Sequence, residues 1–138
     1  MYDRTNLYAA QSFHRFASGD HTRAIADAVD VIGRLASMKM SAYWNFHALE
    51  AALDTLFTAA KNPNRDLGRE IARGCAEGRR MARFCVFARP SALLWDGRRL
   101  ALSGKVLRAR ALWGKAEALA REKDVTWVAE TARRLLQE

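Results

Sequence analysis

The sequence predicts an all-α protein with about seven helices, and three observations support that fold class. The 138 residues include 26 alanines and 15 leucines but only 8 glycines and 2 prolines, a composition that favours helices. Apolar residues recur at spacings of three and four along the chain. No run of β-branched residues alternates with polar ones, as it would in a half-buried strand. We therefore expect helices joined by tight turns.

Six short breaker segments divide the chain into the expected helices. They lie at residues 18–20, 38–41, 61–64, 88–90, 103–105 and 122–124. Capping signals agree with this division, because Asp20 and Ser41 precede apolar periodic segments and Pro90 suits a first helical turn. We expect one domain over residues 1–138, built from hairpins at residues 2–38, 41–88 and 90–122 and a last helix at residues 125–137.

The segment from residue 42 to residue 61 is expected to be a surface helix with two unlike faces. Its apolar stripe consists of Ala42, Phe46, Leu49, Leu53, Leu56 and Ala60. The opposite stripe begins with His47, Glu50 and Asp54, whose spacing suits a metal site or a proton-transfer pair. Thr58 and Lys61 share that stripe, however, as on any solvated face. We therefore assign no metal-binding or catalytic residue.

The segment from Arg65 to Phe87 is predicted to be one helix with an apolar face and an arginine face. Cys75 and Cys85 would then lie about 15 Å apart along the helix axis, too far for a disulfide bond. Gly74 and Gly78 on the apolar face indicate a closely approaching neighbour helix, because each is about 1 kcal/mol less favourable than alanine. The arginine face consists of Arg65, Arg69, Arg73, Arg79, Arg80 and Arg83.

The net charge of +8 is concentrated in one part of the chain. Residues 65–115 hold 13 of the 23 lysines and arginines but only 4 of the 15 acidic residues. Guanidinium groups bind oxyanions through two parallel hydrogen bonds, and a cluster of them attracts anionic partners. We predict that Arg69, Arg73, Arg80 and Arg83 contact the acidic groups of a partner. Two alternatives are binding to nucleic-acid phosphates and an ordinary solvated face with no specific role.

An internal repeat aligns two helix-turn-helix units of the chain. Placing Gly19 over Gly104 brings Ala24 over Ala109, five residues after each glycine. A glycine accepts the positive φ that a tight turn needs, and a small residue after it lets antiparallel helices cross closely. The same alignment pairs Ser12 with Gly97, Ala28 with Trp113, and Val31 with Ala116.

The second of these units resembles the tetratricopeptide repeat (TPR) over about 34 residues. The resemblance rests on the order and spacing of Gly97, Leu100, Gly104, Ala109, Trp113 and Ala116. It implies a short solenoid of stacked antiparallel hairpins with a capping helix at its end. It also implies a peptide groove that is lined by the first helix of each hairpin, with Asn6, Phe13 and Arg98 facing the groove. Phe13 fits a core position as well as the groove.

The steps Arg89-Pro90 and Trp95-x-Gly97, followed by Gly104, also resemble a more specific group of sequences. These are the divergent repeat regions that follow the catalytic or ATPase modules of large bacterial signalling proteins, such as adenylate cyclases and signal-transduction ATPases. The resemblance implies a regulatory piece or a free-standing relative. The sequence contains no phosphate-binding glycine-rich loop of the G-x-x-x-x-G-K-[ST] type.

Together these features predict a non-enzymatic scaffold or regulatory module that binds another protein through a groove and a basic face, without a cofactor. The alternative is a helical nucleic-acid-binding protein that uses the arginine face. No stretch of the sequence approaches the roughly 18 apolar residues of a membrane span, and the first residues lack the apolar block of a secretion signal. We therefore expect a cytoplasmic protein.

Overall fold

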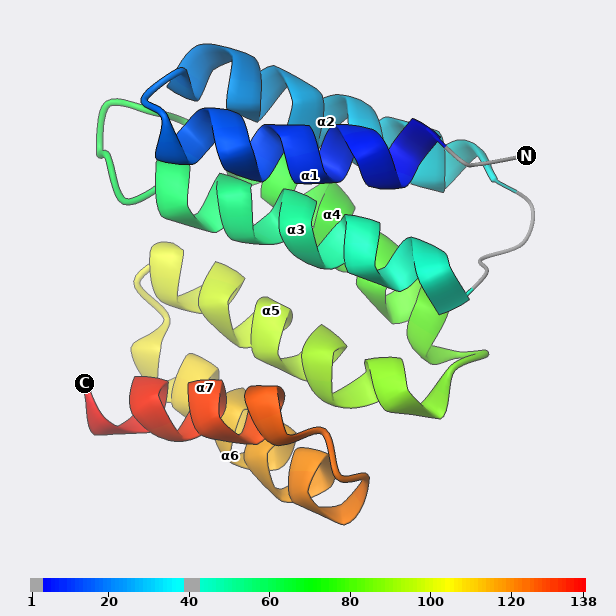
Figure 1. The fold of residues 1–138 in the computed structure, drawn as a ribbon. Helices are drawn as coiled ribbons and strands as arrows, with labels where there is room; N and C mark the ends of the chain where they lie inside the picture. The colour runs from blue at the N-terminus through cyan, green and yellow to red at the C-terminus, as the bar shows by residue number, and fades with distance from the viewer. Residues whose placement is uncertain (1–3, 39–42) are drawn as a thin grey trace. The chain divides into compact units, whose positions relative to one another are not determined.

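The computed structural model describes residues 4–38 and 43–138, and in these residues the chain forms seven α-helices and no strand (Figure 1). The predicted all-α class is therefore confirmed. The chain divides into two compact units, Met1–Glu77 (the first unit) and Gly78–Glu138 (the second unit). The helices are α1 (Arg4–Ala17), α2 (His21–Ser37), α3 (Tyr43–Ala59), α4 (Gly68–Ala82), α5 (Arg89–Leu102), α6 (Val106–Glu122) and α7 (Thr126–Gln137), with a 3-10 turn η1 (Val86–Ala88). Stacking of hairpins into a solenoid within a single domain stays a prediction.

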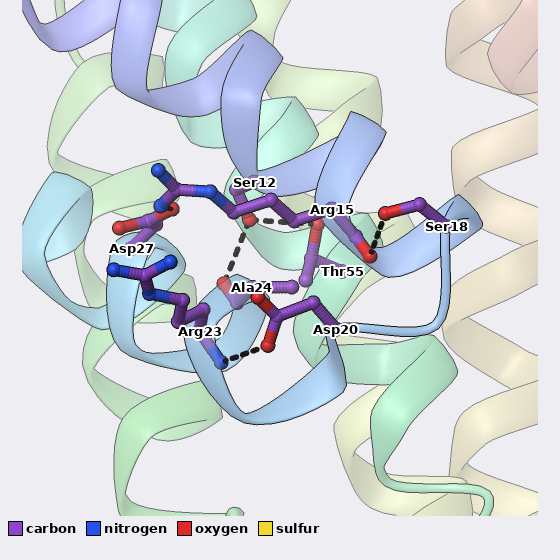
Figure 2. A network of polar contacts seen from close by, with 8 residues as sticks. All are labelled: Ser12, Arg15, Ser18, Asp20, Arg23, Ala24, Asp27 and Thr55. Carbon is purple, nitrogen blue, oxygen red and sulfur yellow. Dashed lines mark hydrogen bonds and ion pairs between the residues drawn. The ribbon is translucent and has the colours of Figure 1, made fainter.

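In the first unit, α1 packs against α2 and α3, and α2 packs against α3. Asp20 caps α2 as predicted, since its side chain accepts a hydrogen bond from the backbone N–H of Arg23. Figure 2 shows the polar contacts at this end of the unit. The buried Ser12 hydroxyl donates to the carbonyl oxygen of Ala24 at 2.8 Å and lies 3.3 Å from the Thr55 hydroxyl, so it links α1 to α2 and α3.

Helix α3 is buried around more of its circumference than a surface helix would be. Leu49, Leu53 and Leu56 of the predicted stripe are fully buried. The prediction of a surface helix is nevertheless wrong in extent, because α3 also buries the following residues: Ala48, Ala52, Thr55, Phe57 and Ala59. Small and hydroxyl side chains on the second side allow this burial, while His47 and Thr58 stay exposed. Ser41 and Ala42 lie outside the described residues.

Helix α4 is shorter than predicted and does not continue to Phe87. It ends at Ala82, and Cys85 has an extended backbone with φ −121° and ψ 109°. Proline has no N–H to donate, so Pro90 suits the first turn of a new helix and not the interior of a continuing one. The chain instead starts a new helix there, with Pro90 in the first turn of α5 as predicted. Cys75 and Cys85 form no disulfide bond with each other, and they do not share a helix.

The predicted close approach at Gly74 is confirmed within the first unit. A Cβ atom built on Gly74 would come 2.6 Å from Cδ2 of Leu53 and 2.9 Å from Cδ1 of Ile32. Both side chains are buried. Glycine at this position therefore lets α4 lie against α2 and α3.

The two turns that the sequence alignment pairs have the same backbone geometry. Gly19 and Gly104 have positive φ angles of 91° and 75°. In each turn the residue after the glycine donates its backbone N–H to a carbonyl five residues earlier, from Asp20 to Arg15 and from Lys105 to Leu100, both at 2.9 Å. Ala24 and Ala109 are completely buried, as their roles at the helix crossings require. Classification of these hairpins as TPR units stays a prediction.

In the second unit, α5 packs against α6, and α6 packs against α7. A third tight turn joins α6 to α7, where Asp124 takes a positive φ of 56° and Val125 donates to the Ala120 carbonyl at 2.8 Å. The sequence alignment does not include this turn, because no glycine marks it. The core of the unit consists of Leu94, Ala109, Trp113, Ala116, Ala120, Val128, Ala129 and Ala132.

Candidate functional site

The two units differ sharply in charge. The first unit has 9 lysines and arginines and 9 acidic residues, so its formal net charge is zero. The second unit has 14 lysines and arginines and 6 acidic residues, so it carries the whole net charge of +8. A net charge of this size creates a positive electrostatic potential that attracts anionic groups and speeds their association with the second unit.

The four arginines predicted to bind a partner are divided between the units. Arg69 and Arg73 are exposed on α4 in the first unit, and no acidic side chain lies within 4 Å of either among the described residues. In the second unit, Arg80 is half-buried near the end of α4. Arg83 is exposed and lies beyond the end of α4, so its predicted place on the helix is wrong.

Residues 83–89, here called the α4–α5 segment, expose large apolar side chains beside arginines. The side chains of Phe84, Phe87 and Val86 are 80%, 56% and 40% exposed. Arg83 and Arg89 border this apolar surface and are both exposed. The sequence pattern does not reveal the two phenylalanines, because their spacing fits a continuous helix. The nearest sequence signal is Pro90, which marks the start of a new helix soon after them.

Backbone hydrogen bonds hold the α4–α5 segment in place. The N–H groups of Phe84 and Cys85 donate to the Met81 carbonyl at 3.1 and 2.9 Å. Nε of Arg89 donates to the Ala82 carbonyl at 3.2 Å, which satisfies one of the free carbonyls at the end of α4. The segment therefore presents its phenylalanines from a defined turn.

The sequence around the α4–α5 segment holds almost no negative charge. Residues 78–116 contain ten lysines and arginines and a single acidic residue, Asp96. Asp96 forms an ion pair with Arg79, and its Oδ1 lies 3.9 Å from Nε of Arg99. Burial raises the pKa of the Asp96 carboxyl above its ordinary value, while Arg79 and Arg99 act in the opposite direction. Asp96 is thus already paired with two arginines. Arg83 has no acidic side chain within 4 Å among the described residues.

A second exposed apolar group lies at the turn between α5 and α6. Leu102 and Val106 are each half exposed and Leu107 is 85% exposed. Lys105 and Arg108 are exposed beside them. This turn combines the same residue classes as the α4–α5 segment, but with aliphatic side chains in place of phenylalanines.

The predicted groove residues receive little structural support. Asn6 and Phe13 belong to α1, but their side chains lie outside the described residues. Arg98 is half-buried on α5 in the second unit. The groove therefore stays a prediction that the sequence resemblance implies.

Two of the polar side chains on α3 form a hydrogen-bonded pair. Nδ1 of His47 lies 3.4 Å from Oε2 of Glu50. Burial raises the pKa of Glu50, the hydrogen bond from His47 lowers it, and the charge of Asp54 raises it. In the part of the chain that the structure describes, no three histidine, cysteine, aspartate or glutamate side chains are grouped so that they could hold a metal ion.

Comparison of the chain with protein-family models, with curated proteins and with solved structures finds no match. The helices within residues 4–38 and 43–138 are all too short or too polar to cross a membrane.

Proposed function

We propose that the chain is a non-enzymatic, cytoplasmic interaction module that binds an acidic protein partner mainly through its second unit. One observation carries this proposal: the second unit holds the entire net charge of +8, while the first unit is neutral. Large exposed apolar side chains accompany that charge in two places. Arginine and aromatic residues in combination are typical of binding hot spots between proteins.

The helical hairpins support the same proposal. Glycine turns and small residues at the helix crossings fit a TPR-like scaffold, whose usual role is to present a surface and not a reactive centre. In this proposal the module is a regulatory part of a larger signalling system, as the sequence resemblance implies. Arg69 and Arg73 would contact acidic groups separately, on the first unit.

The proposal is tested by capture of partners with the full chain from a lysate of the organism that encodes it. The informative variant combines Arg83→Glu with Arg108→Glu, two exposed arginines of the second unit. A matched control combines Arg23→Glu with Lys61→Glu, which change the charge by the same amount in the first unit. Quantitative mass spectrometry identifies the proteins that each form retains, with and without nuclease treatment of the lysate.

We expect proteins that are retained by the wild type and the control variant and lost by the second-unit variant, regardless of nuclease treatment. Loss of all captured proteins after nuclease treatment would favour the nucleic-acid alternative, because phosphate contacts would then mediate the capture. Equal capture by all three forms would contradict the proposed role of the charge on the second unit.

A further inference from the structure

We propose that the α4–α5 segment is the docking site of the second unit, and that its partner is an acidic protein segment with apolar side chains between its carboxylates. This inference rests on the proposed function and deepens it, since it assigns the surface and the chemistry of the partner. The surface consists of Phe84, Val86 and Phe87 with Arg83 and Arg89 at its edges.

The exposure of the phenylalanines requires a reason within the second unit. Phe84 is 80% exposed although the same unit buries Trp95 completely and Trp113 almost completely. The free energy falls when apolar side chains leave water. An exposed aromatic pair of this kind is therefore typical of a surface that a partner covers. The hydrogen bonds to Met81 and Ala82 fix the turn, so binding would not have to order it first.

The charges beside the phenylalanines specify the occupant. Residues 78–95 contain four arginines and no acidic residue, and Arg83 and Arg89 among them are exposed beside the phenylalanines. An apolar partner without carboxylates would leave these two cations partly desolvated, which costs free energy. A segment that carries glutamate or aspartate beside its apolar residues would instead pair with Arg83 and Arg89.

The type of cation favours oxyanions that accept two parallel hydrogen bonds, as carboxylates do. All six basic residues between positions 78 and 104 are arginines, and none is a lysine. The guanidinium group matches a carboxylate through two parallel hydrogen bonds, whereas lysine acts as a point charge. The surface has two arginines at its edges, Arg83 and Arg89. Nucleic-acid binding usually takes its affinity from a larger number of phosphate contacts.

The second unit offers a matched control for this site. Leu107 is as exposed as Phe84, and Arg108 beside it is exposed like Arg83. Both lie in the first turn of α6, at the other end of α5. Phe84→Ala can therefore be compared with Leu107→Ala at similar fractional exposure, and Arg83→Glu with Arg108→Glu at equal change of charge.

The test measures the binding of a fluorescently labelled synthetic peptide to the full chain by anisotropy. The peptide carries glutamates and leucines at helical spacing, and a control peptide has glutamine in place of each glutamate. We expect the acidic peptide to bind the wild type and the control peptide to bind more weakly. Phe84→Ala and Arg83→Glu should each lower the affinity for the acidic peptide by about tenfold, a typical effect of changing a residue that contributes to binding. Leu107→Ala should leave its affinity unchanged, and Arg108→Glu should weaken it less than Arg83→Glu does.

Three results would overturn the inference. The first is equal weakening by the variants at the two sites, and the second is failure of the acidic peptide to bind the wild type. The third is that single-stranded DNA or phosphatidylglycerol vesicles bind more tightly than the acidic peptide does, and that Phe84→Ala weakens the binding of those probes. If lysate capture still depends on the charge of the second unit, only the inference fails and the proposed function stands. Circular dichroism of each variant excludes unfolding as the cause of a loss.

Discussion

The indole of Trp113 lies so close to Gly97 that a Cβ atom built on Gly97 would come 2.5 Å from Nε1 of Trp113 and 2.6 Å from its Cδ1. The same Cβ would lie 3.2 Å from the backbone oxygen of Ala109. Trp113 is a core residue of the second unit, and Ala109 is completely buried at the crossing of α5 and α6. Glycine at position 97 is therefore what permits these two helices to pack at this distance.

Gly97→Ala should lower the unfolding free energy of the second unit by about 2 kcal/mol, because a methyl group in a filled core forces the tryptophan or the backbone to move. The intrinsic helix preference of alanine offsets only about 1 kcal/mol of the overpacking. Urea denaturation followed by tryptophan fluorescence measures the effect, since three of the four tryptophans lie in the second unit. An unchanged urea midpoint would show that α5 and α6 can separate without cost.

Gly114 provides the control for that experiment. It lies in α6, and a Cβ atom built on it meets no atom within 4 Å. Gly114→Ala should therefore raise the unfolding free energy by up to about 1 kcal/mol through helix preference alone. A loss of stability in both variants would indicate that glycine is required for a reason other than space.

Gly104→Ala should lower the unfolding free energy by about 1 kcal/mol for a different reason. No atom lies within 4 Å of a Cβ built on Gly104, so the cost comes from its positive φ of 75° and not from a clash. Gly104→Asn should cost less, because asparagine tolerates the left-handed conformation better than alanine does. Thermal unfolding of the two variants gives the comparison, and equal midpoints for alanine and asparagine would contradict it.

These glycines illustrate how far the sequence predicts the fold. A positive φ and a helix crossing each restrict the side chain at one position, so glycine at 19, 74 and 104 indicated turns and close contacts that the structure confirms. The turn at Asp124 has the same backbone hydrogen bond, and residues 122–124 are a predicted breaker segment, but without a glycine the sequence does not indicate the positive φ there.

The candidate site was harder to predict than the fold. Arginine spacing indicated a basic surface, but an amphipathic pattern cannot show where a helix ends. Phe84 and Phe87 fit a helix period through residue 87, and the backbone constraint of Pro90 comes only after them. Their exposure depends on how the chain turns after Ala82, which is a tertiary property. Side chains on α3 were also misjudged, because alanine and threonine pack on either a buried or a solvated face.

The pKa of Glu50 predicts a pH dependence of stability in the first unit. Burial raises this pKa above 4.5, so the folded state keeps the proton of Glu50 to a higher pH than the unfolded state does. The contribution of Glu50 to the unfolding free energy therefore falls as the pH rises from 4.5 through the raised folded pKa. Above that interval the half-buried carboxylate is charged and destabilises the fold.

Glu50→Gln should remove this dependence, because glutamine does not titrate. Relative to the wild type, the variant should gain unfolding free energy as the pH rises from about 4 to about 7. His47→Ala should extend the pH interval upward in the wild-type background, since the hydrogen bond from His47 lowers the pKa of Glu50. Urea midpoints across this pH range provide the measurement, and parallel curves for Glu50→Gln and the wild type would contradict the assignment.

Charge reversal at the predicted partner-binding arginines should have small effects on stability with opposite signs. Arg69 is in the first turn of α4, where a negative charge favours the positive end of the helix dipole, so Arg69→Glu should stabilise the fold slightly. Arg83 follows the last turn, where a positive charge is favourable, so Arg83→Glu should destabilise it slightly. Each change should stay within about 1 kcal/mol and shrink at high salt, because both side chains are exposed. Thermal unfolding at low and high ionic strength measures both effects. A tenfold loss of peptide binding at Arg83→Glu with so small a change in stability would come from the reversed charge at the binding surface and not from unfolding, whereas a large fall in the unfolding midpoint would show that Arg83 supports the fold.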